Sequence, residues 1–137
     1  MRLLGIDYGM KRIGIALSDP DGVMTHPLET IVVRPDGAHI EAIRKIADAY
    51  QVEKVVVGLP YNMNGTLGTS GDEVLRWGRH LEEVLGLPVV FWDERLTTSE
   101  AHDFLLGLKV KGRKRKTIVD KIAASIILKG YLDSENP

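Results

Sequence analysis

The sequence predicts an α/β fold in which a mixed five-stranded sheet carries helices on both of its faces. Residues 2–7, 12–18 and part of 25–34 are short apolar runs joined by hairpin-sized connections, which favours three antiparallel strands. Beyond these strands, segments with helical periodicity alternate with short apolar runs, as in parallel β-α-β units. We expect residues 1–137 to form a single domain, because a chain of this length builds one hydrophobic core.

The helices are predicted from apolar residues that recur every three or four positions. Segment 37–51 carries Ile40, Ile43 and Ala47 on one face, and segment 71–86 repeats this pattern. The remaining predicted elements are apolar strands at 54–59 and 89–93, a polar loop at 60–71, a helix from about residue 99 and a final helix at 117–132.

The charge of the chain is unevenly distributed, although its net value is only −1. A basic strip within segment 107–121 sets seven basic residues against one acid, and the rest of the chain carries 11 basic and 18 acidic residues. Such asymmetry favours the docking of a polyanion at one place, and a solvated loop is the alternative. The strip consists of Lys109, Lys111, Arg113, Lys114, Arg115, Lys116 and Lys121.

Composition excludes several classes of protein. The chain has no cysteine, so it has neither disulfides nor thiolate metal sites. The opening MRLLGIDYG lacks the apolar region of a secretory signal, and no apolar run is long enough to cross a bilayer. We therefore expect a cytoplasmic protein without a membrane partner.

Four carboxylates occupy predicted positions where an uncompensated charge is costly. Asp7 ends the first apolar strand, Asp93 and Glu94 end the last one, and Asp120 lies among small apolar residues of the final helix. Parallel strands place ligands at their carboxyl ends, which is where the first three acids fall. Because neighbouring strand residues face opposite ways, only one of Asp93 and Glu94 can share a pocket with Asp7.

Each of these acids also has a purely structural explanation. Asp7 could form an Asx turn into the following glycine, and either Asp93 or Glu94 could pair with Arg95. Asp120 could close a capping box with Thr117 at the start of the final helix. The alternative is that the acids converge on a metal ion.

Convergence of three carboxylates requires a cation, because like charges repel at short range. Oxygen ligands alone suit Mg²⁺ or Mn²⁺ better than zinc. Two such ions can activate a water and stabilise the leaving oxygen of a phosphodiester displacement. The basic strip reaches Lys116, one helical turn before Asp120, so charges suited to phosphate and to metal are neighbours in the sequence. This combination predicts a metal-dependent nuclease.

Four motifs then resemble one family, the YqgF or RuvX-like family. They occur in the family's order and cover the chain almost end to end. The resemblance implies the ribonuclease H-like fold and a nuclease that processes the 5′ end of pre-16S ribosomal RNA, or that resolves Holliday junctions. The motifs are GIDYGMKRIGIALSD (5–19), EKVVVGLPYNMNGTLG (53–68), VVFWDERLTTSEA (89–101) and TIVDKIAASIIL (117–128).

The resemblance also implies which residues form the site. The family's catalytic and metal-binding acids correspond to Asp7, Glu94 and Asp120, with Mg²⁺ or Mn²⁺ as cofactor. The alternation of strand residues alone does not choose between Asp93 and Glu94. The residues expected to bind nucleic acid are Lys11, Arg12, Asn62, Gly65, Arg95, Arg113, Lys114, Arg115 and Lys116.

Four questions stay open at the level of sequence. The substrate is structured RNA by family resemblance, but a DNA junction fits the same chemistry, and the chain could be a monomer or a homodimer. The opening around Asp7 and Gly9 also resembles the phosphate-binding hairpin of actin-like and sugar-kinase proteins, which suggests nucleotide binding instead. A nucleic-acid-binding module without catalysis would equally explain the basic strip.

Overall fold

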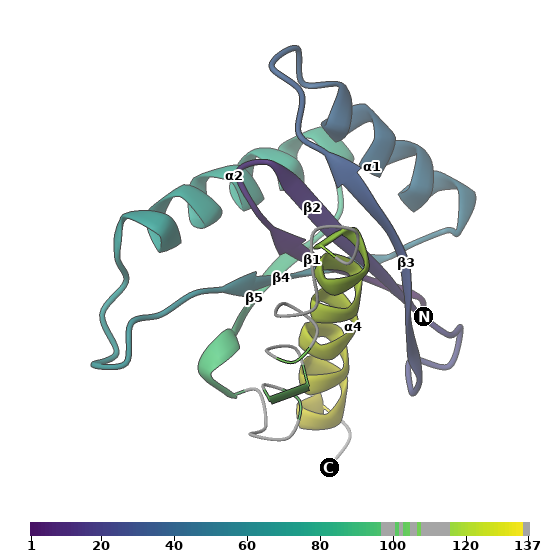
Figure 1. Cartoon of the computed structure of the whole chain (residues 1–137). Coiled ribbons are helices and arrows are strands. Elements are labelled where there is room, and N and C mark those ends of the chain that lie inside the picture. Colours follow the sequence, from purple (N-terminus) through teal and green to yellow (C-terminus); the bar gives the residue numbers. More distant parts are fainter. Residues whose placement is uncertain (97–100, 102, 105–106, 108–115, 136–137) are drawn as a thin grey trace.

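The computed structural model describes residues 1–96, 101, 103–104, 107 and 116–135, and it contains the predicted five-stranded mixed sheet. The strands lie in the order β3-β2-β1-β4-β5, with the first three antiparallel and β1, β4 and β5 parallel. Figure 1 shows helices α1 and α2 on one face of this sheet and α4 on the other. The strands are β1 (Leu3–Tyr8), β2 (Arg12–Ser18), β3 (Thr25–Val32), β4 (Lys54–Leu59) and β5 (Val89–Asp93).

Two hydrophobic clusters, one on each face of the sheet, hold the layers together. Helices α1 (Ala38–Ala49) and α2 (Thr69–Leu85) cover the larger cluster, in which β1 contributes Leu4 and Ile6. Helix α4 (Lys116–Glu135) covers the smaller cluster, in which β1 contributes Leu3. The alternation of buried side chains along β1 therefore places Asp7 on the α4 face, two positions after Gly5.

Helix α4 approaches the sheet closely because glycines leave room for it. A side chain at Gly5 would meet the Cβ of Leu128 at 2.7 Å and the carbonyl oxygen of Ala124 at 2.8 Å. A side chain at Gly14 would overlap the backbone carbonyl of Asp120. The first turns of α4 thus lie almost against the backbone of β1 and β2, on the face that carries Asp7.

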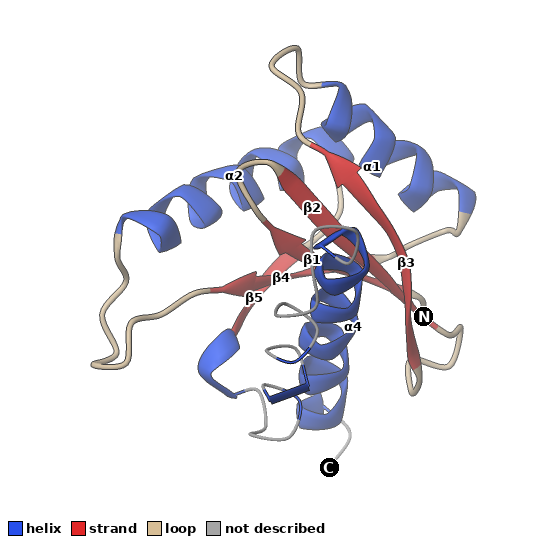
Figure 2. Ribbon diagram, viewed as in Figure 1, coloured by secondary structure: helices blue, strands red, loops and turns tan. Residues whose placement is uncertain are grey.

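The layered arrangement in Figure 2 confirms the predicted fold class, and the differences are local. Helix α2 begins at Thr69, two residues before the predicted start, and its N-cap is Gly68. Helix α4 begins at Lys116, so Thr117 lies inside the helix and not at the cap that a capping box with Asp120 requires. Of the helix predicted from about residue 99, the structure describes only residues 101, 103–104 and 107, and all four are helical.

The loop after β4 is more ordered than the sequence predicts. An isolated bridge pairs Tyr61 with Leu67, so most of this connection is a small hairpin. Its turn needs glycine, because Gly65 has a φ of 84°. The hairpin leaves the sheet at the end where the parallel strands β1 and β5 also terminate.

In the described part of the chain, no helix has both the length and the apolar character that crossing a membrane requires.

The contact between α4 and β2 predicts a stability effect. Gly14→Ala is expected to lower the free energy of unfolding by about 1–3 kcal/mol, because the new methyl group overlaps the Asp120 carbonyl. Urea denaturation measures this change. Gly107→Ala is the control, since no described atom lies within 4 Å of its Cβ position. A Gly14→Ala protein as stable as the parent would contradict the described packing.

Candidate active site

Asp7 lies at the carboxyl end of the central strand, between two glycines. It pairs with Gly14 of β2 in the antiparallel register. On the other side Ile6 pairs with Val57, so the next position on β4 beside Asp7 is Gly58. Gly14, Asp7 and Gly58 therefore form one row across the sheet. On the α4 face of this row only Asp7 has a side chain. Asp7 is partly buried and makes a polar interaction in the structure.

Glu94 occupies the space left empty at Gly58. A Cβ at Gly58 would meet Glu94 Oε1 at 2.7 Å and the Cδ1 of Ile127 at 2.5 Å. Ile127 belongs to α4, so the Glu94 carboxylate lies on the same face of the sheet as Asp7. Glu94 begins the short 3-10 helix η1 (Glu94–Leu96) directly after β5. Its side chain thus turns back over the strand that neighbours Asp7.

Asp120 lies on the opposite side of Asp7, over β2. Its backbone carbonyl contacts the Gly14 position, and its carboxylate Oδ2 accepts a 2.7 Å hydrogen bond from Arg12 Nε. The two side chains of this ion pair are 31% and 21% exposed, so water screens it only partly. Arg12, expected from the sequence to bind phosphate, is therefore the present partner of one of the expected metal ligands.

Asp93 is bound to Arg95. The Arg95 guanidinium donates to both carboxylate oxygens, with Nη2 at 2.7 Å from Oδ2, and its backbone N–H donates to Oδ1. These hydrogen bonds, the side-chain ones first, hold the pKa of Asp93 below its usual value. Asp93 follows Phe91 in the strand alternation, on the face of the larger cluster. The sequence left open whether Asp93 or Glu94 pairs with Arg95, and in the structure Asp93 does.

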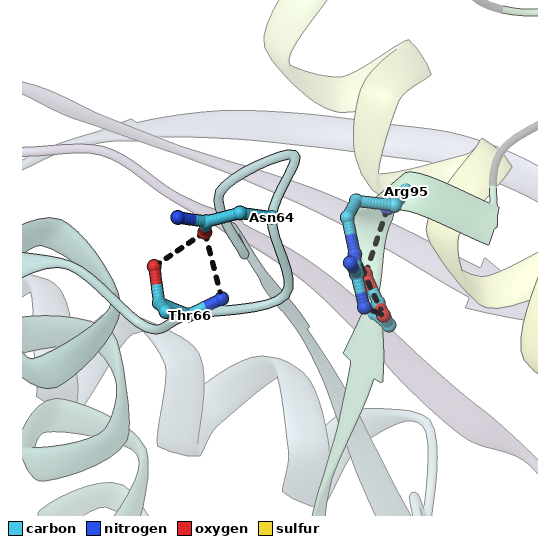
Figure 3. Close-up of polar contacts among 4 residues, drawn as sticks. Asn64, Thr66 and Arg95 are labelled. Atoms are coloured by element: carbon cyan, nitrogen blue, oxygen red, sulfur yellow. Dashed lines mark hydrogen bonds and ion pairs between the residues drawn. The ribbon is translucent and has the colours of Figure 1, made fainter.

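Arg95 also contacts the hairpin that follows β4. Its guanidinium carbon lies 5.1 Å from the centre of the Tyr61 ring, and its Nη1 lies 3.6 Å from the Cβ position of Gly65. Figure 3 shows Arg95 beside the loop that contains Asn64 and Thr66. The sequence predicts that Asn62, Gly65 and Arg95 bind nucleic acid. The structure brings Arg95 next to Gly65, and Asn62 belongs to the same hairpin.

Carboxylates are the ligand type that a hard divalent cation prefers, but these acidic residues do not form a complete coordination site. Among the described residues, no three Asp, Glu or His side chains are grouped closely enough to hold a metal ion. The Asp120 carboxylate is bound to Arg12 in this structure. Carboxylate oxygens are the ligand type that Mg²⁺ and Mn²⁺ prefer, and the binding of such an ion by Asp7, Glu94 and Asp120 stays a prediction.

The structure describes only some of the other residues that we expect to bind nucleic acid. Lys11 is exposed in the β1–β2 turn, at the same end of the sheet as Asp7. Lys116 starts α4, and nothing is described of its side chain. Arg113, Lys114 and Arg115, the centre of the basic strip, lie outside the described residues.

Comparison with solved structures gives the class of fold. Thermus thermophilus RuvC in complex with a Holliday junction substrate matches with a TM-score of 0.64, covering 98% of this chain and 96% of that chain. The sequence identity is 15%, so this likeness concerns the fold alone. The chain therefore has the ribonuclease H-like fold of the RuvC-type resolvases.

Comparison of sequences gives the family. The family described as "RuvX: Holliday junction resolvase" matches residues 1–134. A protein of Caldanaerobacter subterraneus subsp. tengcongensis, named "Putative pre-16S rRNA nuclease", is 50% identical over 136 residues, 98% of both chains. A Bacillus cereus protein of the same name is 44% identical over 98% of this chain and 100% of its own. This chain belongs to the RuvX family of nucleases.

The contact between Asp93 and Arg95 predicts a pH effect. Because the folded-state pKa is lowered, the pair stabilises the fold above the pKa of the unfolded chain, and this contribution disappears as the pH falls through the folded value. Arg95→Ala is expected to return the pKa of Asp93 toward its ordinary value, measured by carboxyl-carbon NMR titration. Glu82, whose pKa is lowered mainly by the Val89 N–H, is the internal control. An unmoved Asp93 titration would show that Arg95 is not the cause.

Proposed function

We propose that this chain is a divalent-metal-dependent endo- or exonuclease that hydrolyses phosphodiester bonds during 5′-end processing of pre-16S ribosomal RNA. The names of relatives up to 50% identical over nearly the whole chain support the substrate. One observation carries the chemistry: glycines on both sides of Asp7 let Glu94 approach on one side and the Asp120 segment on the other. Three acids from distant parts of the sequence thereby flank a single row of the sheet.

Asp7, Glu94 and Asp120 would hold Mg²⁺ or Mn²⁺. When bound, such a cation activates the attacking water and stabilises charge on the leaving oxygen. Asp7 is the central ligand in this arrangement, because it alone lies between the other two acids. The Glu94 side chain lies over Gly58 of β4, in space that a Cβ at that position would fill.

Arg12 and Lys11 would bind the phosphate to be cleaved. Arg12 is already at this end of the sheet, 2.7 Å from the Asp120 carboxylate, and a phosphate offers its guanidinium charged acceptor oxygens of the same kind. Transfer of Arg12 to the substrate would free Asp120 for the cation. The basic strip would bind the phosphates farther along the strand, and its contacts make binding weaken with added salt.

Resolution of a DNA junction is the second candidate. The description of the matching family as Holliday junction resolvase favours it. Such a reaction cuts two strands symmetrically and therefore requires a dimer with two-fold symmetry. A protein that remains monomeric in solution, measured by sedimentation in the presence of a four-way junction, would exclude this candidate.

The proposal predicts the effect of removing the central acid. Asp7→Asn is expected to lower the rate of metal-dependent cleavage of structured RNA about a hundredfold or more, because an amide is a poorer cation ligand than a carboxylate. Binding of the RNA should be unchanged or tighter, since one negative charge is lost. Single-turnover cleavage and filter binding, each with and without Mn²⁺, measure the two quantities.

Asp21→Asn is the matched control for this experiment, because Asp21 is exposed in the β2–β3 turn, at the opposite end of the sheet. It should cleave like the parent. A four-way DNA junction is tested in parallel, and cleavage of the junction with none of the RNA would replace the first candidate by the second. Full cleavage of both substrates by Asp7→Asn would end the proposal.

The glycine beside Glu94 provides an independent prediction. Gly58→Ala places a methyl group where Glu94 Oε1 and Ile127 Cδ1 lie, so the carboxylate must leave its present position over β4. Cleavage is expected to fall at least about tenfold, beyond what a stability loss of about 1–3 kcal/mol explains for a protein that stays folded.

Gly78→Ala separates the two effects. Its Cβ would meet the Phe91 ring at 2.6 Å on the other face of the sheet, so it adds similar crowding away from the acids. Urea denaturation and cleavage are measured for both variants. If Gly58→Ala and Gly78→Ala lost stability and activity in the same proportion, Glu94 would have no special place in the reaction.

A further inference from the structure

The most exposed large apolar side chain in the described part of the protein lies beside the candidate active site. Met63 is 93% exposed, at the tip of the hairpin that follows β4. The next most exposed, Met10 at 72%, lies in the β1–β2 turn at the same edge of the sheet. Single exposed apolar residues are common, so the exposure of Met63 alone does not indicate a function. The structure of the loop that carries Met63 must be considered with it.

The hairpin holds Met63 outward by a dense set of polar contacts. Asn62 donates its N–H to the carbonyl of Thr66 at 2.8 Å, and Gly65 donates to the carbonyl of Asn62 at 2.9 Å. The Oδ1 of Asn64 accepts from both the N–H and the hydroxyl of Thr66, as Figure 3 shows. These bonds leave the loop polar groups satisfied around an apolar tip that packs on nothing described.

The base of the hairpin is fixed to the rest of the molecule. Leu67 packs into the space left by Gly71 in the first turn of α2, and Tyr61 lies under the Arg95 guanidinium. Arg95 follows Glu94 in the chain and is itself tied to Asp93. The tip that bears Met63 is therefore coupled, through a short series of contacts, to the strand end that carries the proposed metal ligand.

We propose that Met63 is a wedge that packs between neighbouring bases of a nucleic acid held at the candidate active site. This inference rests on the proposed function and adds the residue that opens the base stack near the cut. Apolar wedges, methionine among them, partly unstack base steps in this way. Segment 60–71 carries no charged residue, so it can approach a polyanion without charge repulsion.

The test uses RNA hairpins that each carry one 2-aminopurine at a different position across the junction of stem and loop. The protein carries Asp7→Asn, so that the RNA stays intact during the measurement. We expect 2-aminopurine fluorescence to rise on binding at one or two positions, because the probe base loses its stacking partner. In Asp7→Asn/Met63→Ala this rise should disappear, with binding weakened about three- to tenfold. Asp7→Asn/Met63→Phe should restore it.

Asp7→Asn/Met24→Ala is the matched control, because Met24 is 61% exposed in the turn at the opposite edge of the sheet. It should give the same fluorescence and affinity as Asp7→Asn. Equal fluorescence and affinity with and without Met63 would overturn the wedge. That result leaves the nuclease proposal intact.

The same series is run with 2-aminopurine in a four-way DNA junction. An effect of Met63 on the junction alone would keep the wedge and change the substrate. If Asp7→Asn bound neither probe, the proposed function and the wedge that rests on it would both be refuted.

Discussion

The absence of side chains on either side of Asp7 is the constraint on which the candidate site depends. Gly14 lets the Asp120 segment of α4 lie against β2, and Gly58 lets the Glu94 carboxylate lie against β4. Even one methyl group at either place would collide with backbone or with the carboxylate itself. Three acids that are far apart in the sequence can flank one row of the sheet only because two strands are bare there.

Around this row, arginines determine which acids are available. Arg95 binds Asp93 through both carboxylate oxygens, so the acid on the far face of β5 is neutralised within the fold. Arg12 pairs with Asp120 on the near face, and this contact competes with any cation that Asp120 would bind. The same guanidinium groups that balance the acids are those that a phosphate would attract. We propose that a bound polyanion would redistribute these charge pairs.

Much of the fold could be predicted from sequence, because strand alternation and helical periodicity are local signals. The strands 54–59 and 89–93 and the mixed topology are confirmed, as is the placement of helices on both faces. The roles of Gly14 and Gly58 could not be predicted, since a glycine in a strand does not reveal which distant atom approaches it. The partner of Arg12 was equally hidden, because 108 residues separate it from Asp120. That Asp7, Glu94 and Asp120 bind metal remains a prediction.

Anomalous diffraction from crystals grown with Mn²⁺ and a short nucleic acid tests the central claim most directly. The account predicts an anomalous peak within ligand distance of the Asp7 and Glu94 carboxylates, between β2 and β4 on the α4 face, with Arg12 moved from Asp120 to a phosphate. A peak that avoids Asp7, or a nucleic acid bound with Arg12 still paired to Asp120 and no metal beside it, would contradict the account.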